Sequence, residues 1–180
     1  MHNLLARNAP SFAMLGLVTF FGLAGCSDLR HTPSCVDYFK TGDMGRFKLE
    51  NPYVVQDSET RLFWYRCAAG QTIVEGRCVG DPMVLDWNQA KAYAVEFSQA
   101  SGRTWRVPEY EEMKALSETR CENPAYNTNA FPGLPVENFW TSTTQIGSLW
   151  QACSVYTHTG HGHCRTRKVE PMMLMLVSDP

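Results

Sequence analysis

The sequence predicts an α+β domain, because its β-prone runs and its two helical segments fall in separate blocks along the chain. Short β-prone runs come first, two helices follow, an irregular stretch comes next, and the remaining segments are again β-prone. Strands alternating regularly with helices would instead predict a parallel sheet. With 180 residues, 44% of them hydrophobic, the chain is long enough to bury a core and is not mainly disordered.

The first strands are expected at residues 53–55 and 62–65, where valine and aromatic side chains gather. Asp-Ser-Glu at residues 57–59 supplies turn chemistry between them, so the two strands should form a hairpin. The segment from Cys67 to Cys78 contains two glycines and is expected to be a loop, which a Cys67–Cys78 disulfide would close.

The first helix has both a start signal and a stop signal. Asp86 can cap a helix that begins at Trp87, and Gly102 is suited to its end. Between them, apolar residues recur at helical spacing, which predicts one buried stripe. The stripe consists of Trp87, Ala90, Ala94 and Phe97.

The second helix is expected to carry Pro108 in its first turn, after an extended piece at residues 103–107. Acidic residues at positions 109, 111 and 112 suit the positive end of such a helix. Residues 120–138 are rich in Asn and Pro and should be irregular. The last strands are expected at 139–143, 149–157, 164–169 and 172–177, with Cys153 and Cys164 placed to bridge the turn at 159–162.

Residues 1–25 are predicted to be a signal peptide, because Arg7 precedes a mainly apolar run at residues 12–24. The run is shorter than the roughly 20 residues that a spanning helix needs. It ends in Leu23-Ala24-Gly25-Cys26, which resembles the lipobox of bacterial lipoproteins, where the cysteine is acylated and becomes the first residue. The alternatives are an uncleaved anchor and an ordinary signal peptide that happens to end near a cysteine.

The lipobox resemblance implies a protein held on a membrane by lipid on Cys26. Ser27 after it, in place of Asp, implies the outer membrane of a Gram-negative bacterium. Residues 26–45 are then the lipidated N-terminus and tether, and residues 46–178 the domain. Using Cys26 leaves an even set of six cysteines, which in an exported chain implies disulfides. Cys35 and Cys121 remain for each other once the two nearer pairs are formed.

Several motifs occur in an order that resembles the bacterial Lcl C-terminal domain family. They are Arg66-Cys67-x-x-Gly70-Gln71, Trp87-x-x-Ala90, Trp105-Arg106-Val107-Pro108, Cys121-x-x-Pro124-Ala125 and Phe139-Trp140-Thr141-Ser142. The resemblance implies a C-type-lectin-like fold, which formylglycine-generating enzymes share. That fold has two helices and a twisted antiparallel sheet carrying a long irregular loop. The shared tryptophans, and Arg106 with Glu112 as a candidate partner, are expected to be structural.

The densest group of candidate metal ligands is His158, His161 and His163, which lie close to Cys164. Imidazole and thiolate bind zinc and copper. Because these histidines surround a Gly-rich turn, an exposed polar hairpin tip is the favoured interpretation, and no metal or other cofactor is expected. A lectin-type calcium site is not expected either, since no acid-rich loop is present.

An enzyme of the formylglycine type would need Cys153 and Cys164 as a reactive pair, and a structural disulfide is favoured over this. Candidates for a binding surface are Tyr126, Trp140, Trp150 and Tyr156, because aromatic residues are enriched at interfaces, although most should be core.

The formal charge of −2 argues against nucleic acid as the main partner. We therefore expect a non-enzymatic, membrane-anchored module for adhesion or for ligand or glycan recognition at the cell envelope. The alternative is an accessory subunit of an envelope machine, such as a pilus, a flagellum or a secretion complex, with a protein partner.

Overall fold

The structure is a computed structural model that describes residues 32–180. Helices and antiparallel strands occur in separate blocks along this part of the chain, so the predicted α+β class is confirmed. The expected signal peptide, Cys26 and the first part of the tether lie outside the described residues. Within residues 32–180, no helix is long and apolar enough to cross a membrane.

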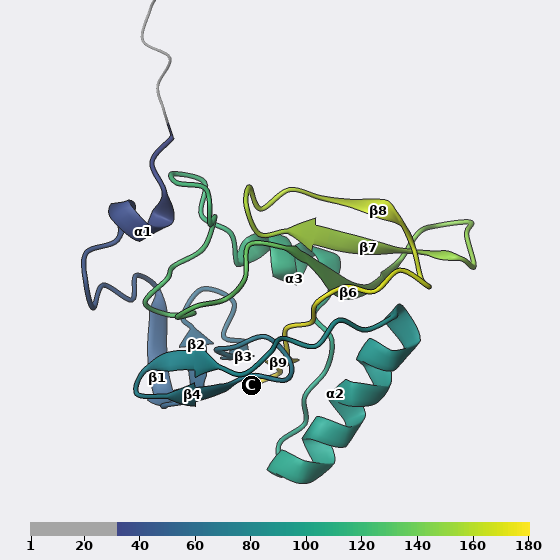
Figure 1. Ribbon diagram of the computed structural model, residues 1–180, viewed down its shortest axis with the longest axis horizontal. Coiled ribbons are helices and arrows are strands. Elements are labelled where there is room, and N and C mark those ends of the chain that lie inside the picture. Colours follow the sequence, from purple (N-terminus) through teal and green to yellow (C-terminus); the bar gives the residue numbers. More distant parts are fainter. Residues whose placement is uncertain (1–31) are drawn as a thin grey trace, which may run out of the picture. The chain divides into compact units, whose positions relative to one another are not determined.

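The strands of residues 32–180 form three antiparallel sheets in place of one (Figure 1). The first sheet has the order β1-β2-β3-β9, with β1 (Phe47–Asn51), β2 (Val54–Asp57), β3 (Phe63–Tyr65) and β9 (Val177–Ser178). The second pairs β4 (Thr72–Val74) with β5 (Arg77–Val79). The third has the order β6-β7-β8, with β6 (Asn138–Thr144), β7 (Gln151–Tyr156) and β8 (Gly162–Arg167).

The hairpin expected near residue 60 is confirmed, with Val55 of β2 opposite Trp64 of β3. The segment between Cys67 and Cys78 is more regular than the expected loop, because it contains the β4–β5 hairpin. Its turn residues Glu75 and Gly76 have φ values of 49° and 77°. Two successive positive φ values match the right-handed twist of paired strands, which explains why this short turn supports a hairpin.

Helix α2 (Trp87–Ser101) begins and ends as its sequence predicts. The Asp86 side chain accepts hydrogen bonds from the first turn, and the Gln89 side chain accepts one from the Asp86 amide, which forms a capping box. Gly102 ends the helix in the left-handed conformation, at φ 72°.

Helix α3 (Tyr110–Ala115) starts later than expected, because Glu109 and not Pro108 precedes its first turn. The Glu109 amide donates a 2.7 Å hydrogen bond to the Glu112 side chain, so Glu109 takes the capping position. Pro108 is held outside the helix, where its carbonyl accepts a 2.8 Å hydrogen bond from the amide of Ser142 in β6.

A third helix, α1 (Cys35–Tyr38), lies within the segment expected to be a tether. Ser34 caps it by accepting a 3.2 Å hydrogen bond from the Val36 amide. Cys35 is fully buried and forms a small apolar cluster with Phe39 and Cys121. The folded part of the chain therefore begins before residue 46.

Three of the expected last strands have wrong bounds. The strand expected at 164–169 is β8, which spans Gly162–Arg167. Leu149 and Trp150 precede β7 and belong to the loop after β6. Of residues 172–177, only Val177 lies in a strand. The remaining residues cannot form a ladder because their partners change every residue or two, in the order Leu85, Trp140, Ala69 and Tyr65.

This C-terminal segment lies between the two large parts of the core. Leu174 and Leu176 belong to the cluster around Trp87 and Trp105. Met175 and Val177 belong to the cluster around Trp64 and Phe131. Alternate residues thus face opposite clusters, and this explains why the run is continuously apolar.

Candidate functional site

Four aromatic side chains line a surface pocket between the first sheet and the C-terminal end of α2. The pocket encloses about 430 Å³. Its lining residues are Asn51, Tyr53, Val54, Tyr65, Thr72, Phe97, Ser101, Arg103 and Trp105. They come from β1, β2, β3, β4, the turn between β1 and β2, α2 and the segment after it. Several of these segments are far apart in the sequence and meet only in the fold.

The aromatic wall is built from edge-to-face contacts. The Tyr65 ring lies 5.2 Å from Phe97 and 6.0 Å from Trp105, centroid to centroid, and Phe97 lies 6.1 Å from Trp105. Such pairs are favourable beyond the area they bury. Trp105 is brought back beside α2 because its amide donates a 2.7 Å hydrogen bond to the Ser98 hydroxyl after the turn at Gly102.

Polar groups surround this wall. The Tyr65 hydroxyl donates a 3.1 Å hydrogen bond to the Gln71 carbonyl. Burial raises the pKa of Tyr65 above its ordinary value. The indole N–H of Trp105 is buried and has no hydrogen-bond partner in the part of the chain that the structure describes. Tyr53 is 47% exposed and presents its ring to solvent.

The guanidinium of Arg103, which lines this pocket, is held in place by three contacts. Its guanidinium carbon lies 4.0 Å from the centroid of the Phe63 ring, and a head nitrogen pairs with the Glu50 carboxylate. Its Nε donates a 3.2 Å hydrogen bond to the Ser178 hydroxyl. The pocket thus combines apolar ring faces with hydrogen-bonding groups, which is the usual composition of a small-molecule site.

Two of the four aromatic candidates for a binding surface are core residues, as the sequence analysis expected for most of them. Trp140 is fully buried, and its indole N–H donates a 2.8 Å hydrogen bond to the Leu85 carbonyl. Tyr126 is 3% exposed, its hydroxyl bonds to the Leu134 carbonyl, and burial raises its pKa. Trp150 and Tyr156 remain at the surface, 78% and 38% exposed.

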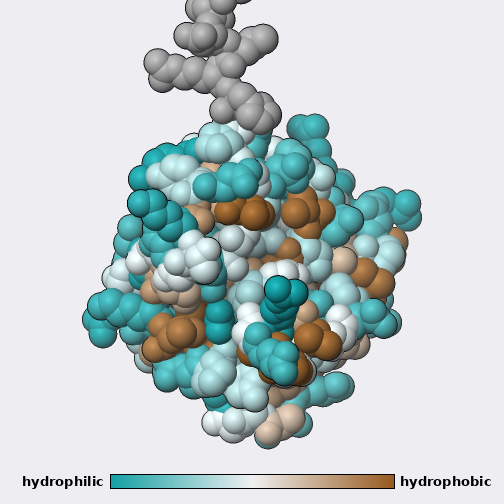
Figure 2. All heavy atoms as spheres, turned by 60° about the vertical axis from the view of Figure 1, so that its left-hand side comes forward, coloured by the Kyte–Doolittle hydropathy of each residue, from teal (hydrophilic) through white to brown (hydrophobic). Residues whose placement is uncertain are grey.

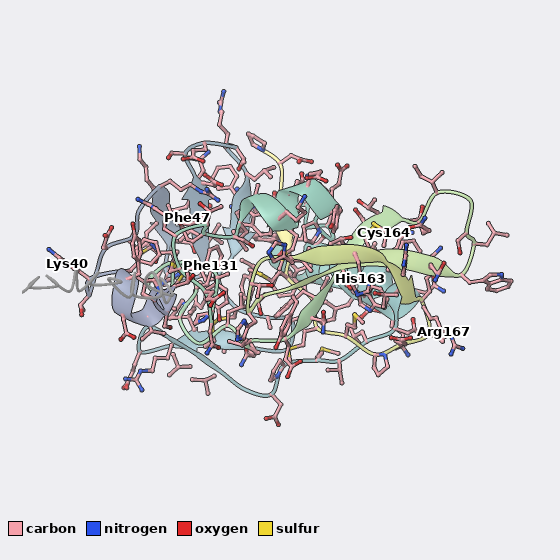
Figure 3. The ribbon with its side chains drawn as sticks, turned by 90° about the horizontal axis from the view of Figure 1, so that it is seen from above. Lys40, Phe47, Phe131, His163, Cys164 and Arg167 are labelled. Carbon is pink, nitrogen blue, oxygen red and sulfur yellow. A yellow bond between two sulfur atoms is a disulfide. The ribbon has the colours of Figure 1, made fainter. Side chains whose placement is uncertain are left out.

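The three candidate histidines do not converge. His161 and His163 line a shallow hollow of about 280 Å³ beside Tyr156. His158 instead stacks on the Tyr156 ring, at 5.5 Å between centroids. Nδ1 of His163, labelled on β8 in Figure 3, accepts a 3.3 Å hydrogen bond from the Arg165 amide. Among residues 32–180, no three His, Cys, Asp or Glu side chains group as a metal site requires.

The six cysteines after Cys26 form three disulfides, which are Cys35–Cys121, Cys67–Cys78 and Cys153–Cys164. These are the pairs considered from the sequence. Cys153 and Cys164 lie on β7 and β8 and join adjacent strands. Cys26 lies outside the described residues.

The motif arginine next to Cys67 has a structural role. Arg66 is 7% exposed, and its guanidinium donates to three backbone carbonyls. The acceptors are Ala130 and Pro52, each at 2.8 Å, and Asn129 at 2.9 Å. Arg66 therefore ties the irregular stretch after α3 to the first sheet.

Arg106 binds two carboxylates. It donates to both oxygens of Glu112, at 2.7 Å each, and to Asp179 at 2.6 Å. Burial of Glu112 alone would raise its pKa, but the hydrogen bonds from Arg106 and from the Glu109 amide outweigh this and leave the pKa below its ordinary value. The expected pairing of Arg106 with Glu112 is therefore present. Because Arg106 also binds Asp179, it links α3 to the C-terminal end of the chain.

The family model described as the Lcl C-terminal domain matches residues 53–178. This match covers more than half of the chain, so the chain belongs to that family, as the motifs predicted. A comparison with curated proteins found no match.

Proposed function

We propose that this member of the Lcl C-terminal domain family is a non-enzymatic binding module of the cell envelope, and that it recognises a glycan through the aromatic pocket beside α2. The observation that carries the proposal is the wall of edge-packed aromatic rings bordered by hydrogen-bonding side chains. The α+β architecture with antiparallel sheets is compatible with a C-type-lectin-like fold, which we propose for the domain.

The chemistry of the pocket suits a sugar ring. A sugar ring has an apolar C–H face and a polar hydroxyl edge, and exposed Tyr53 offers a ring face for the former. Asn51, Thr72 and Ser101 can hydrogen-bond the hydroxyls. The volume of about 430 Å³ lies within the range of roughly 300–1,000 Å³ that is common for small-molecule sites.

We further propose that lipid on Cys26 holds the module on the outer membrane. The Leu-Ala-Gly-Cys sequence at residues 23–26 supports lipidation, and Ser27 supports sorting to the outer membrane. The three disulfides support an oxidising compartment outside the cytoplasm. One of them holds Cys153 and Cys164, the pair that an enzyme of the formylglycine type would need as free thiols.

A glycan array probed with the detergent-solubilised native protein tests the binding proposal, with Tyr53→Ala as the pocket variant. Loss of a central aromatic contact costs more than about 1.4 kcal/mol, so at least a tenfold weakening is expected. Leu49→Ala is the matched control, because Leu49 is 55% exposed on β1 and does not line the pocket. Absence of glycan binding, or equal binding by Tyr53→Ala, would overturn the proposal.

Co-purification from the same detergent extract tests the alternative. A stoichiometric protein partner that remains bound to Tyr53→Ala would favour an accessory subunit of an envelope machine over a glycan-binding module. Mass spectrometry of the N-terminal peptide tests the anchor separately. The expected species is an acylated Cys26 followed by Ser27, and a mature chain that starts elsewhere would refute it.

A further inference from the structure

The loop between β6 and β7 carries large apolar side chains into solvent. Ile146 is 95% exposed, Leu149 81% and Trp150 78%, and Val169 on the neighbouring turn is 70% exposed. We call these four residues the apolar tip. The loop projects beyond the strands of the third sheet (Figure 1). Lys168 connects the turn to the loop, because its amide donates a 2.9 Å hydrogen bond to the Trp150 carbonyl.

The apolar tip differs from the other apolar groups at the surface. On the face turned forward in Figure 2, hydrophobic residues form small, separate groups among hydrophilic ones. The other four tryptophans of the chain are at most 8% exposed. Trp150 is therefore the single exposed tryptophan, and it lies beside the two most exposed aliphatic side chains of residues 32–180. Apolar side chains concentrated in this way indicate a contact with another surface.

Basic residues surround the apolar tip. Arg165 and Arg167 are exposed on β8, and Figure 3 shows Arg167 at the end of the domain opposite Lys40. The ammonium groups of Lys91 and Lys168 both lie near the Trp87 ring, at 4.4 Å and 4.3 Å from its centroid. The acidic residues on the same elements are Asp86, Glu96 and Glu170. Four basic groups against three acidic ones leave these elements with a net positive charge, which suits an anionic surface.

The loop carries its own backbone hydrogen bonds. The Gln145 amide donates to the Gln151 carbonyl, and the Ser148 amide donates to the Gln145 carbonyl, each at 3.1 Å. The ammonium group of Lys168 donates to the Leu149 carbonyl at 3.0 Å. Most loops stay out of a lipid environment because their backbone N–H and C=O groups lack hydrogen-bond partners there. In this loop several of these groups already have partners within the protein.

We propose that the apolar tip inserts into the headgroup region of an anionic lipid bilayer. Tryptophan favours the membrane interface, and basic residues close to the surface are attracted to anionic lipids. The tip is a projection of four side chains, whereas a stable protein interface buries about 800 Å² per partner, so a bilayer suits it better than a protein surface. The contact does not depend on lipidation of Cys26 and adds to that anchor.

The test uses the chain from Ser27 onward, which has neither the signal peptide nor the acylated cysteine. Residues 32–180 contain all three core clusters and all three disulfides, so this part holds the contacts that its fold needs. Tryptophan emission is measured with vesicles of phosphatidylcholine alone and of phosphatidylcholine mixed with phosphatidylglycerol. A blue shift and quenching by lipids brominated near the headgroup are expected with the anionic vesicles, since Trp150 is the exposed fluorophore.

Two variants separate insertion from nonspecific binding. Ile146→Ser combined with Leu149→Ser should weaken sedimentation with anionic vesicles at least about tenfold, whereas Leu49→Ser on β1 should leave it unchanged. Trp150→Phe should remove the fluorescence response and retain sedimentation. A Trp150 that remains open to an aqueous quencher with anionic vesicles, or equal binding by the double variant, would overturn the proposal.

Discussion

We expect that replacing Arg66 by methionine strongly lowers the free energy of unfolding of the domain. The guanidinium of Arg66 is the hydrogen-bond donor for three carbonyls, those of Pro52, Asn129 and Ala130. Methionine keeps much of the length of the side chain but donates to none of them. The carbonyls would then stay buried without these bonds, because Arg66 itself is only 7% exposed.

The magnitude follows from the number of bonds. A hydrogen bond to a charged group contributes about 1.5–3 kcal/mol, but water can reach part of the vacated site, so a total of about 4 kcal/mol is expected for the set. For a domain of this size, each kcal/mol lowers Tm by roughly 2–4 °C, so Tm should fall by roughly 10 °C. Near-ultraviolet circular dichroism during heating, with the disulfides intact, measures this change.

Two further variants make the result specific. Arg77→Met is the matched control, because Arg77 is exposed on β5, and it should stay within about 0.5 kcal/mol of the native protein. Arg66→Lys should recover less than half of the stability that Arg66→Met loses. The planar guanidinium reaches three carbonyls in different directions, and a single ammonium group cannot bind all three. An Arg66→Met protein within about 1 kcal/mol of the native one would refute the reasoning.

Three other predictions concern a carboxylate, a disulfide and a tryptophan. The pKa of Glu112 is lowered in the folded protein, so its bond to Arg106 stabilises fully above its ordinary pKa of 4.5 and is lost as the pH falls through the folded value. Glu112→Gln should therefore reduce the acid-dependent loss of stability, as measured by urea unfolding at a series of pH values; an unchanged pH profile would contradict this. Replacing Cys35 and Cys121 by serine should destabilise by about 4–5 kcal/mol in urea unfolding, because that disulfide spans 86 residues of sequence, and a loss below about 1 kcal/mol would argue against it. Trp140→Ala should cost about 3–5 kcal/mol and leave vesicle binding by the remaining folded fraction intact, which separates this buried side chain from the exposed tip.

Local signals in the sequence predicted the parts of the fold that depend on neighbouring residues. The ends of α2 follow from Asp86 and Gly102, because capping uses groups within one turn of the helix. The hairpin of β2 and β3 follows from two β-prone runs and the turn between them. The start of α3 differs from the prediction because Pro108 fits a first turn by itself. The Glu112 carboxylate accepts a bond from the Glu109 amide, which is a local cap, and the Ser142 amide donates to the Pro108 carbonyl, which is a contact that only the folded structure supplies.

The candidate site was not predictable in the same way. Tyr65, Phe97 and Trp105 are ordinary core aromatics when considered one at a time, and only their packing shows that they share a pocket wall. Trp140 and Trp150 are equally good surface candidates in the sequence. The structure buries the first and exposes the second, because β6 faces the core at Trp140 whereas Trp150 lies in the loop before β7.

The sequence by itself determined the α+β class, the family and the local starts and stops of its best-defined elements. These depend on residue spacing and on hydrogen bonds that close within a few positions. Only the tertiary structure decided which aromatic side chains reach solvent, how the pocket is assembled, and that residues 172–176 lie between two core clusters instead of forming a strand. Burial depends on contacts between segments far apart in the chain, and no local pattern records which segments will meet.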